Sequence, residues 1–276
     1  MLGKLLKHEF RATGRTMLPL YGAVVALAVL ANFSIRMLTG NVGPLLTIFF
    51  GLIVAAFVIC IIAAAVMTLV LMIKRYYTNY LKDEGYLMHT LPVSVHELVW
   101  SKMLVSVVWF AATFAVIGLV LLLTALIQTD TSLAQFFAGF PSWADIMRAV
   151  REIGIPAGDL WLMGLELLLA VLVGRLYTCL HFYAAMSLGH MFAKDKILLS
   201  IVLFVGISFV LSLATTGYGS LRVVNLDSAP FDVNSARDIL RFARSIIGEM
   251  LLVELIQSAG LYAATVLSLK KGLNLA

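Results

Sequence analysis

The feature that most constrains this sequence is a run of apolar residues, from Pro44 to Ile73, that contains no charged side chain. As a helix, this run would be about 45 Å long, whereas the hydrocarbon core of a bilayer is about 30 Å thick. A helix that is apolar on every side is buried in a large core or in a membrane. The run therefore predicts a membrane-spanning helix that tilts or extends beyond the hydrocarbon.

The same reasoning applies to five further apolar segments of the chain. The chain has 276 residues, of which 62% are hydrophobic and 13% are charged. Soluble domains are about 45–50% apolar and about 25% charged. We therefore predict an all-α, polytopic membrane protein with a single transmembrane domain over residues 1–276. Its six transmembrane helices are expected at Met17–Leu38, Pro44–Ile73, Val99–Ile127, Leu160–Leu188, Ile197–Thr216 and Ile247–Leu269.

Lys and Arg gather at the two ends of the chain and in the even-numbered connections, which places both termini in the cytoplasm by the positive-inside rule. Before the first span, Leu2, Leu5 and Phe10 share one helical face, and Lys4 and Lys7 lie largely on the other. This pattern over residues 1–16 predicts an N-terminal amphipathic interfacial helix along the inner leaflet. A frayed basic tail is the alternative.

The connection between the second and third spans is expected in the cytoplasm, since it carries several Lys and Arg side chains. It is also rich in Tyr and Leu, and an exposed apolar cluster usually indicates a partner. Pro92 prevents a continuous helix, and Ser94 with Glu97 forms the pattern of a capping box. We predict a short folded projection over residues 83–93 and a helix that starts near Val95.

Two stretches resemble a known family. The segments DEGYLMHTLPVS, residues 83–94, and MLGKLLKHEFRATGRTMLPLYG, residues 1–22, resemble the cytosolic loop and the N-terminus of short ABC-2-type permeases. These are the membrane subunits of bacterial ABC exporters, among them permeases that export bacitracin-type antibiotics and phenol-soluble-modulin-type peptides. The resemblance covers about a fifth of the chain.

The resemblance implies that residues 83–93 contain a coupling helix that docks into a separate ATPase. It implies two ABC ATPase subunits, which bind ATP and Mg, and a second permease copy, identical or related. It also implies a bacterial plasma membrane and export of an amphipathic, antimicrobial or toxic peptide. This chain has no Walker motif, so we expect no cofactor and no enzymatic activity in the chain itself. The implied ATPase-docking residues are Asp83, Glu84, Gly85, Tyr86, Leu87 and Leu91.

Arg175 falls near the middle of the fourth span, where a charge costs about 2.5–3.5 kcal/mol or more. Glu166 and Glu254 are the acids that the sequence places inside spans. We predict that Arg175 pairs with one of them and helps to form a pathway or cavity. The alternative is an Arg whose hydrogen bonds go to carbonyls and water.

Small and hydroxyl residues suggest where helices pack closely. Gly22 and Ala26 form a small-xxx-small step on the first span, and Ser208 and Ser212 share a face of the fifth span. In the family that the chain resembles, these two spans face the second copy, which makes the four residues candidates for a dimer interface.

The loops on the outer side contain further helix signals. Ser132 with Gln135 and Ser142 with Asp145 each predict the start of a short helix, whereas residues 218–231 are expected to form a loop. A helix is then expected to run into the last span.

The net charge of +5 follows the topology and the attraction to lipid headgroups, so it does not predict a nucleic-acid partner. Two other classes of membrane protein remain as alternatives to the exporter. A secondary transporter would need ion-coupling residues in its spans, and a non-transporting membrane anchor would use the projection only to bind a cytosolic partner.

Overall fold

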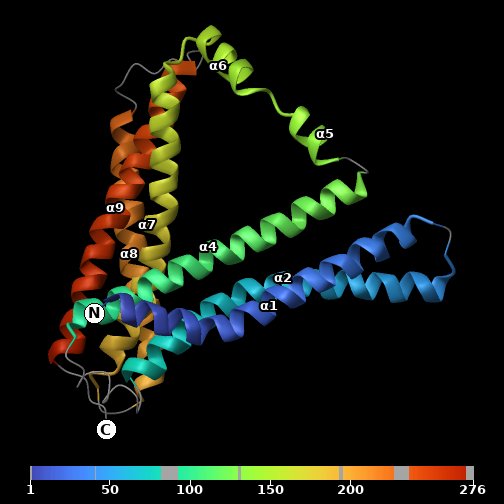
Figure 1. The fold of residues 1–276 in the computed structure, drawn as a ribbon. Helices are drawn as coiled ribbons and strands as arrows, with labels where there is room; N and C mark the ends of the chain where they lie inside the picture. Colours follow the sequence, from blue (N-terminus) through green and yellow to red (C-terminus); the bar gives the residue numbers. More distant parts are fainter. Residues whose placement is uncertain are drawn as a thin grey trace. The chain divides into compact units, whose positions relative to one another are not determined.

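The computed structural model describes residues 2–40, 42–81, 93–129, 132–192, 195–226 and 236–271. Within these ranges the secondary structure is helical, with no strand (Figure 1). Six of the helices in the described ranges are long and apolar enough to cross a membrane. The protein is therefore an all-α, multi-pass membrane protein, as the sequence predicts.

The chain divides into two compact units. Unit 1 comprises Met1–Arg75 and Trp100–Pro141, and unit 2 comprises Tyr76–Val99 and Ser142–Ala276. Unit 1 contains α1 (Leu2–Leu38), most of α2 (Pro44–Tyr76) and of α4 (Val95–Gln128), and α5 (Leu133–Ala138). Unit 2 contains η1 (Tyr77–Leu81), the first turn of α4, α6 (Trp143–Glu152), α7 (Ala157–Gly189), α8 (Lys196–Leu226) and α9 (Ala236–Lys271).

The core of unit 1 lies where α1, α2 and α4 meet. Val24, Ala28 and Ala31 of α1 pack there with Phe57 of α2 and Val120 of α4. Apolar burial does not distinguish packed faces from lipid-facing ones inside a bilayer, so small residues and polar contacts take a larger part in joining the helices.

Hydrogen bonds add to this packing at two levels of the bundle. The hydroxyl oxygens of Tyr21 and Thr113 lie 2.8 Å apart, and that of Thr68 lies 2.8 Å from Thr113, so the three helices meet at one point. Nearer the other end, Asn32 of α1 donates to Thr124 of α4 over 3.0 Å.

Unit 2 is built on α7, which packs against both α8 and α9 (Figure 1). At the turn between α7 and α8, Gly189 allows a very close approach, because a Cβ there would lie 2.8 Å from the backbone Cα of Ser200. Any larger residue at position 189 would push the two helices apart.

The structure confirms several local predictions. Ser94 and Glu97 exchange the two hydrogen bonds of a capping box, each 3.2 Å long, and α4 begins at Val95. Ser142 and Asp145 do the same at the start of α6, and Ser132 with Gln135 at the start of α5. The helix before the last span and that span form one helix, α9.

Other boundaries differ from the sequence prediction. Residues 218–226 are helical and continue α8, although Gly217 and Gly219 favour a loop; the predicted loop is therefore wrong over this part. A helix that is already formed gains a hydrogen bond per added residue, which offsets the cost of an isolated Gly. Residues 2–16 are part of α1 and do not form a separate helix. Whether this part of α1 lies along the inner leaflet stays a prediction.

Candidate functional site: the helices that flank residues 82–92

The predicted docking residues Asp83, Glu84, Gly85, Tyr86, Leu87 and Leu91 lie outside the described residues. The segments on either side are described. On one side α2 continues into the π-helix η1, and on the other side α4 begins at Val95. Single π-helical turns often mark functional positions in helices.

The two flanking segments are joined to each other. The Tyr80 hydroxyl at the end of η1 donates a 2.8 Å hydrogen bond to the Leu98 carbonyl of α4, and both residues are buried. This bond fixes the separation between the points where the chain leaves η1 and enters α4. The helical segments that precede and follow residues 82–92 are therefore held next to each other.

The first flank is attached to α7 by an aromatic stack. The rings of Tyr76 and Tyr183 are nearly parallel, with centroids 3.9 Å apart, and both side chains are fully buried. The Tyr76 hydroxyl lies 2.6 Å from the Ser187 hydroxyl, one turn further along α7. Burial of large rings together with a satisfied hydroxyl makes this a strong and directional contact.

His190 at the C-terminal end of α7 makes a second contact with η1. Its ring meets Tyr77 edge-on at 5.3 Å, and its Nδ1 donates to the Met186 carbonyl over 2.9 Å. Burial lowers the pKa of His190, and the positive charge of Lys196 lowers it further, while the bond to Met186 opposes both effects. The geometry thus favours a neutral imidazole beside Tyr77.

The second flank is attached to α9. His96 Nδ1 lies 2.6 Å from the Tyr262 hydroxyl, and His96 Nε2 lies 3.4 Å from Lys270 Nζ. Because an ammonium group can only donate, Nε2 accepts and Nδ1 carries the proton. These contacts attach the start of α4 to the last turns of α9, so unit 2 holds both flanks.

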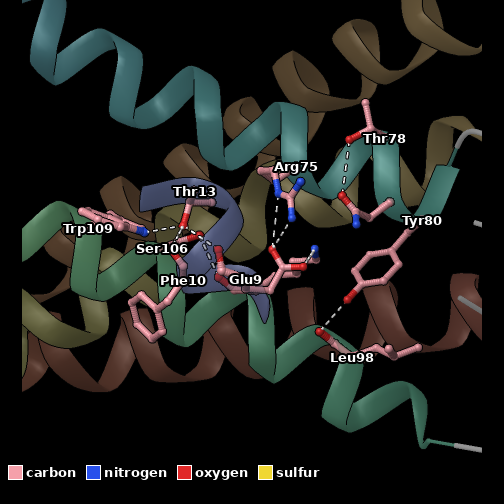
Figure 2. A network of polar contacts seen from close by, with 11 residues as sticks. Glu9, Phe10, Thr13, Arg75, Thr78, Tyr80, Leu98, Ser106 and Trp109 are labelled. Carbon is pink, nitrogen blue, oxygen red and sulfur yellow. Dashed lines mark hydrogen bonds and ion pairs between the residues drawn. The ribbon is translucent and has the colours of Figure 1, made fainter. Parts of the chain in front are cut away.

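In unit 1, a buried carboxylate joins the helices that lead to and from these flanks (Figure 2). Glu9 of α1 accepts from Arg75, in the last turn of α2, over 3.1 Å, and forms a salt bridge with Lys102 of α4. The side chains of Glu9 and Lys102 are only 8% and 3% exposed. One acid thus holds two cations that flank residues 82–92 in the sequence.

Neutral contacts support the Glu9 backbone. Thr13 donates to the Glu9 carbonyl over 2.7 Å, and Trp109 of α4 donates to the Thr13 hydroxyl over 2.7 Å (Figure 2). The Trp109 ring also contacts Phe10 and Tyr21. Sequence reasoning missed this site, although Glu9 is an isolated acid in a basic segment, and Thr13 and Met17 follow it at helical spacing.

A second charged cluster joins α7 and α9 within unit 2. Arg244 of α9 contacts Glu166 through two nitrogens, at 2.9 and 3.2 Å, and Asp159 at 2.9 Å. Glu166 is one of the two acids predicted to pair with Arg175. In the structure it forms a salt bridge with Arg244. The seven-residue spacing of Asp159 and Glu166 on one helical face is the signal that could have suggested a shared cation.

The remaining intramembrane charges lie near the middle of α7 and α9. Arg175 is half-buried, and the salt bridges of the described residues include none between Arg175 and Glu254. Glu254 lies beside Gly174, where a Cβ would be 3.6 Å from the carboxylate oxygen. A methyl group at residue 174 would therefore be in ordinary van der Waals contact with this carboxylate.

The predicted dimer-interface residues have different surroundings. Gly22 and Ala26 lie on the exposed face of α1, and Ser212 is exposed on α8. Ser208 donates to the Phe204 carbonyl over 2.7 Å and lies 3.2 Å from His181 of α7, so it has partners inside unit 2. The assignment of the four to an interface between copies stays a prediction.

In the described part of the chain, no group of three or more His, Cys, Asp or Glu is placed to hold a metal ion. Comparison with known proteins gives no match, whether to protein-family models, to curated proteins or to solved structures. The resemblance to ABC-2 permeases therefore depends on the two sequence segments, 1–22 and 83–94.

Proposed function

We propose that this protein is the membrane subunit of an ATP-driven exporter of the ABC-2 type. In this proposal, residues 83–93 dock into a separate ATPase that binds ATP and Mg. Two permease copies and two ATPase subunits form the complex. It resides in a bacterial plasma membrane, with both termini of this chain in the cytoplasm.

One observation carries the proposal: both flanks of residues 82–92 are attached to a packed helical unit. Tyr76 stacks on Tyr183 of α7, and His96 bonds to Tyr262 of α9. A displacement applied to residues 82–92 is then transmitted to two membrane-spanning helices. Coupling between two sites requires an element of this kind that both sites bias.

The proposed cargo is an amphipathic peptide, antimicrobial or toxic to the cell that exports it. Few charges lie inside the spans, which suits a cargo that crosses with much of its apolar surface in contact with helices or lipid. Self-protection of the producing cell is the expected physiological role.

The test is vanadate-sensitive peptide export by membrane vesicles in which this protein is co-expressed with a candidate ABC ATPase subunit. We expect Glu84→Lys to abolish co-purification of the ATPase. Tyr80→Phe, which removes the bond to Leu98, should keep the ATPase bound but lower substrate-stimulated hydrolysis.

The control is Thr47→Val, which also removes one hydroxyl group but lies on the exposed face of α2. Export that is insensitive to vanadate but abolished when the ion gradient is dissipated would overturn the proposal in favour of a secondary transporter. Binding of a cytosolic partner without any transport would instead indicate a membrane anchor.

A further inference from the structure

A groove in unit 2 is lined by residues of α7, α8 and α9, and the proposed function assigns no role to it. Its volume is about 490 Å³, within the range of small-molecule sites in proteins, about 300–1,000 Å³. The groove lies among segments that the hydropathy of the chain assigns to the membrane. A ligand there is therefore one that also enters lipid.

The charged groups in the described part of the lining are acids. Glu249 and Glu254 of α9 contribute carboxylates, and the described lining contains no Lys or Arg. Arg175, which follows Gly174 on α7, is not among the lining residues. A carboxylate at membrane depth is costly and normally faces a partner or a functional site.

Glu254 differs in this respect from Glu166, the other acid that the sequence places within a span. Glu166 forms a salt bridge with Arg244, whereas the described residues provide no salt bridge to Glu254. A cationic group bound in the groove would supply the missing counter-charge. An anion in the same place would be repelled.

The rest of the lining is mostly apolar and aromatic. Phe242, Met250 and Val253 of α9 and Tyr218 of α8 are among the lining residues. Aromatic faces attract cations, and apolar side chains accept a hydrophobic body. A simple metal ion would gain nothing from these walls, and a neutral acyl chain would leave the Glu254 carboxylate without a counter-charge.

We propose that this groove binds a lipophilic organic cation, a compact apolar molecule that carries one ammonium or phosphonium charge. The binding depends on the shape and charge of the groove alone and needs no ATPase. It therefore goes beyond the proposed export function and can fail or succeed separately from it.

The experiment measures binding of tritiated tetraphenylphosphonium to the full-length protein in lipid nanodiscs, with empty nanodiscs as background. Tetraphenylborate, which has nearly the same shape and the opposite charge, is the matched probe. We expect saturable binding of the cation and no saturable binding of the anion. This comparison needs no mutation, so it is unaffected by misfolded variants.

Two variants locate the site. Glu254→Gln should weaken cation binding at least about tenfold, since it removes the charged partner of a charge-assisted contact. Val253→Phe should abolish binding by filling the groove. The controls, Glu152→Gln on α6 and Leu252→Phe on the exposed side of α9, should bind as the wild type does.

Three results would overturn the proposal. The first is the absence of saturable cation binding above the empty nanodiscs, which would assign the uptake to lipid. The second is equal saturable binding of both ions, which would make the site apolar only. The third is unchanged binding in Glu254→Gln and Val253→Phe variants that elute as the wild type does, which would place the site elsewhere.

Discussion

The two units each contain one cluster of charged side chains that joins helices, and the two clusters have opposite composition. In unit 1 a single acid, Glu9, is shared by two cations, Arg75 and Lys102. In unit 2 a single cation, Arg244, is shared by two acids, Asp159 and Glu166. Glu9 and Lys102 are almost fully buried, whereas Arg75 and the side chains of the second cluster are 23–30% exposed.

The difference in burial determines how each cluster acts. Coulombic interactions are strong and poorly screened in a dry interior, where an unpaired charge is also costly. The Glu9 cluster is therefore expected to be either intact or fully disrupted, and its strength should depend little on salt. Solvent and salt weaken the Arg244 cluster continuously, so that it can adjust its strength to the surroundings.

The units also differ at the end next to residues 82–92. Unit 1 uses charge there, because Arg75 lies in the last turn of α2 and Lys102 lies in the second turn of α4. Unit 2 uses close packing and aromatic rings, as in the Tyr76–Tyr183 stack and the contact of Gly189 with Ser200. The predictions below test this division, from the largest expected effect to the smallest.

The largest effect is expected for Glu9→Gln. Removing the carboxylate takes away the charge that Glu9 supplies to the buried Lys102 ammonium, which costs about 3–5 kcal/mol in the free energy of unfolding. Unfolding by SDS in mixed micelles measures this loss. The control is Lys4→Gln on the exposed face of the same helix, which should change stability by less than about 0.5 kcal/mol.

A second variant shows whether the loss comes from the unpaired charge. Glu9→Gln combined with Lys102→Met removes both partners, so it should be less destabilising than Glu9→Gln alone. If the double variant is less stable than Glu9→Gln alone, the cluster is not held by charge, and the contrast between the units disappears.

Gly189→Ala should have the next largest effect, through packing. The new Cβ would lie 2.8 Å from the Ser200 backbone, which cannot move away as a flexible side chain could. Overpacking of this kind costs about 1–3 kcal/mol. Gly164→Ala on the same helix is the control, since nothing lies within 4 Å of its Cβ, and it should stabilise by about 0.4–1 kcal/mol. Equal effects at both positions would show that close packing of α7 with α8 is unimportant.

Sequence patterns predict the six spans and several of their ends. The charge-free run from Pro44 to Ile73 falls within α2, and the Ser94–Glu97 pair caps α4 as expected. These features are local: they depend on hydropathy over one helix or on hydrogen bonds between residues three apart. Local free energies of this kind can be predicted without the fold.

The site could not be predicted in the same way. Glu9 meets Arg75 and Lys102, which are 66 and 93 residues further along the chain. In a membrane helix both the lipid-facing and the packed sides are apolar, so no amphipathic pattern reveals which face meets another helix. Arg244 lies in the helix that runs into the last span, and only the packing of that helix on α7 brings it to Asp159 and Glu166.

Arg244→Gln should destabilise unit 2 less than Glu9→Gln destabilises unit 1, because its ion pairs are partly solvated. The distinguishing measurement is salt dependence. Raising NaCl from 50 to 500 mM should reduce the effect of Arg244→Gln, since exposed ion pairs are screened, and leave the effect of Glu9→Gln unchanged. The same salt response in both variants would contradict the assigned difference in burial.

The smallest effect concerns pH and the neutral His190 beside Tyr77. Because burial lowers the pKa of His190 in the folded state, the unfolded chain binds a proton first as pH falls. The contribution of His190 to stability is therefore complete above a pH of about 6.5 and declines below it. His190→Gln keeps a donor for the Met186 carbonyl but does not titrate, so the fall in melting temperature between pH 7.5 and 5.5 should be smaller than in the wild type. Equal falls in the two proteins would show that protonation of this ring does not loosen the attachment of η1 to α7.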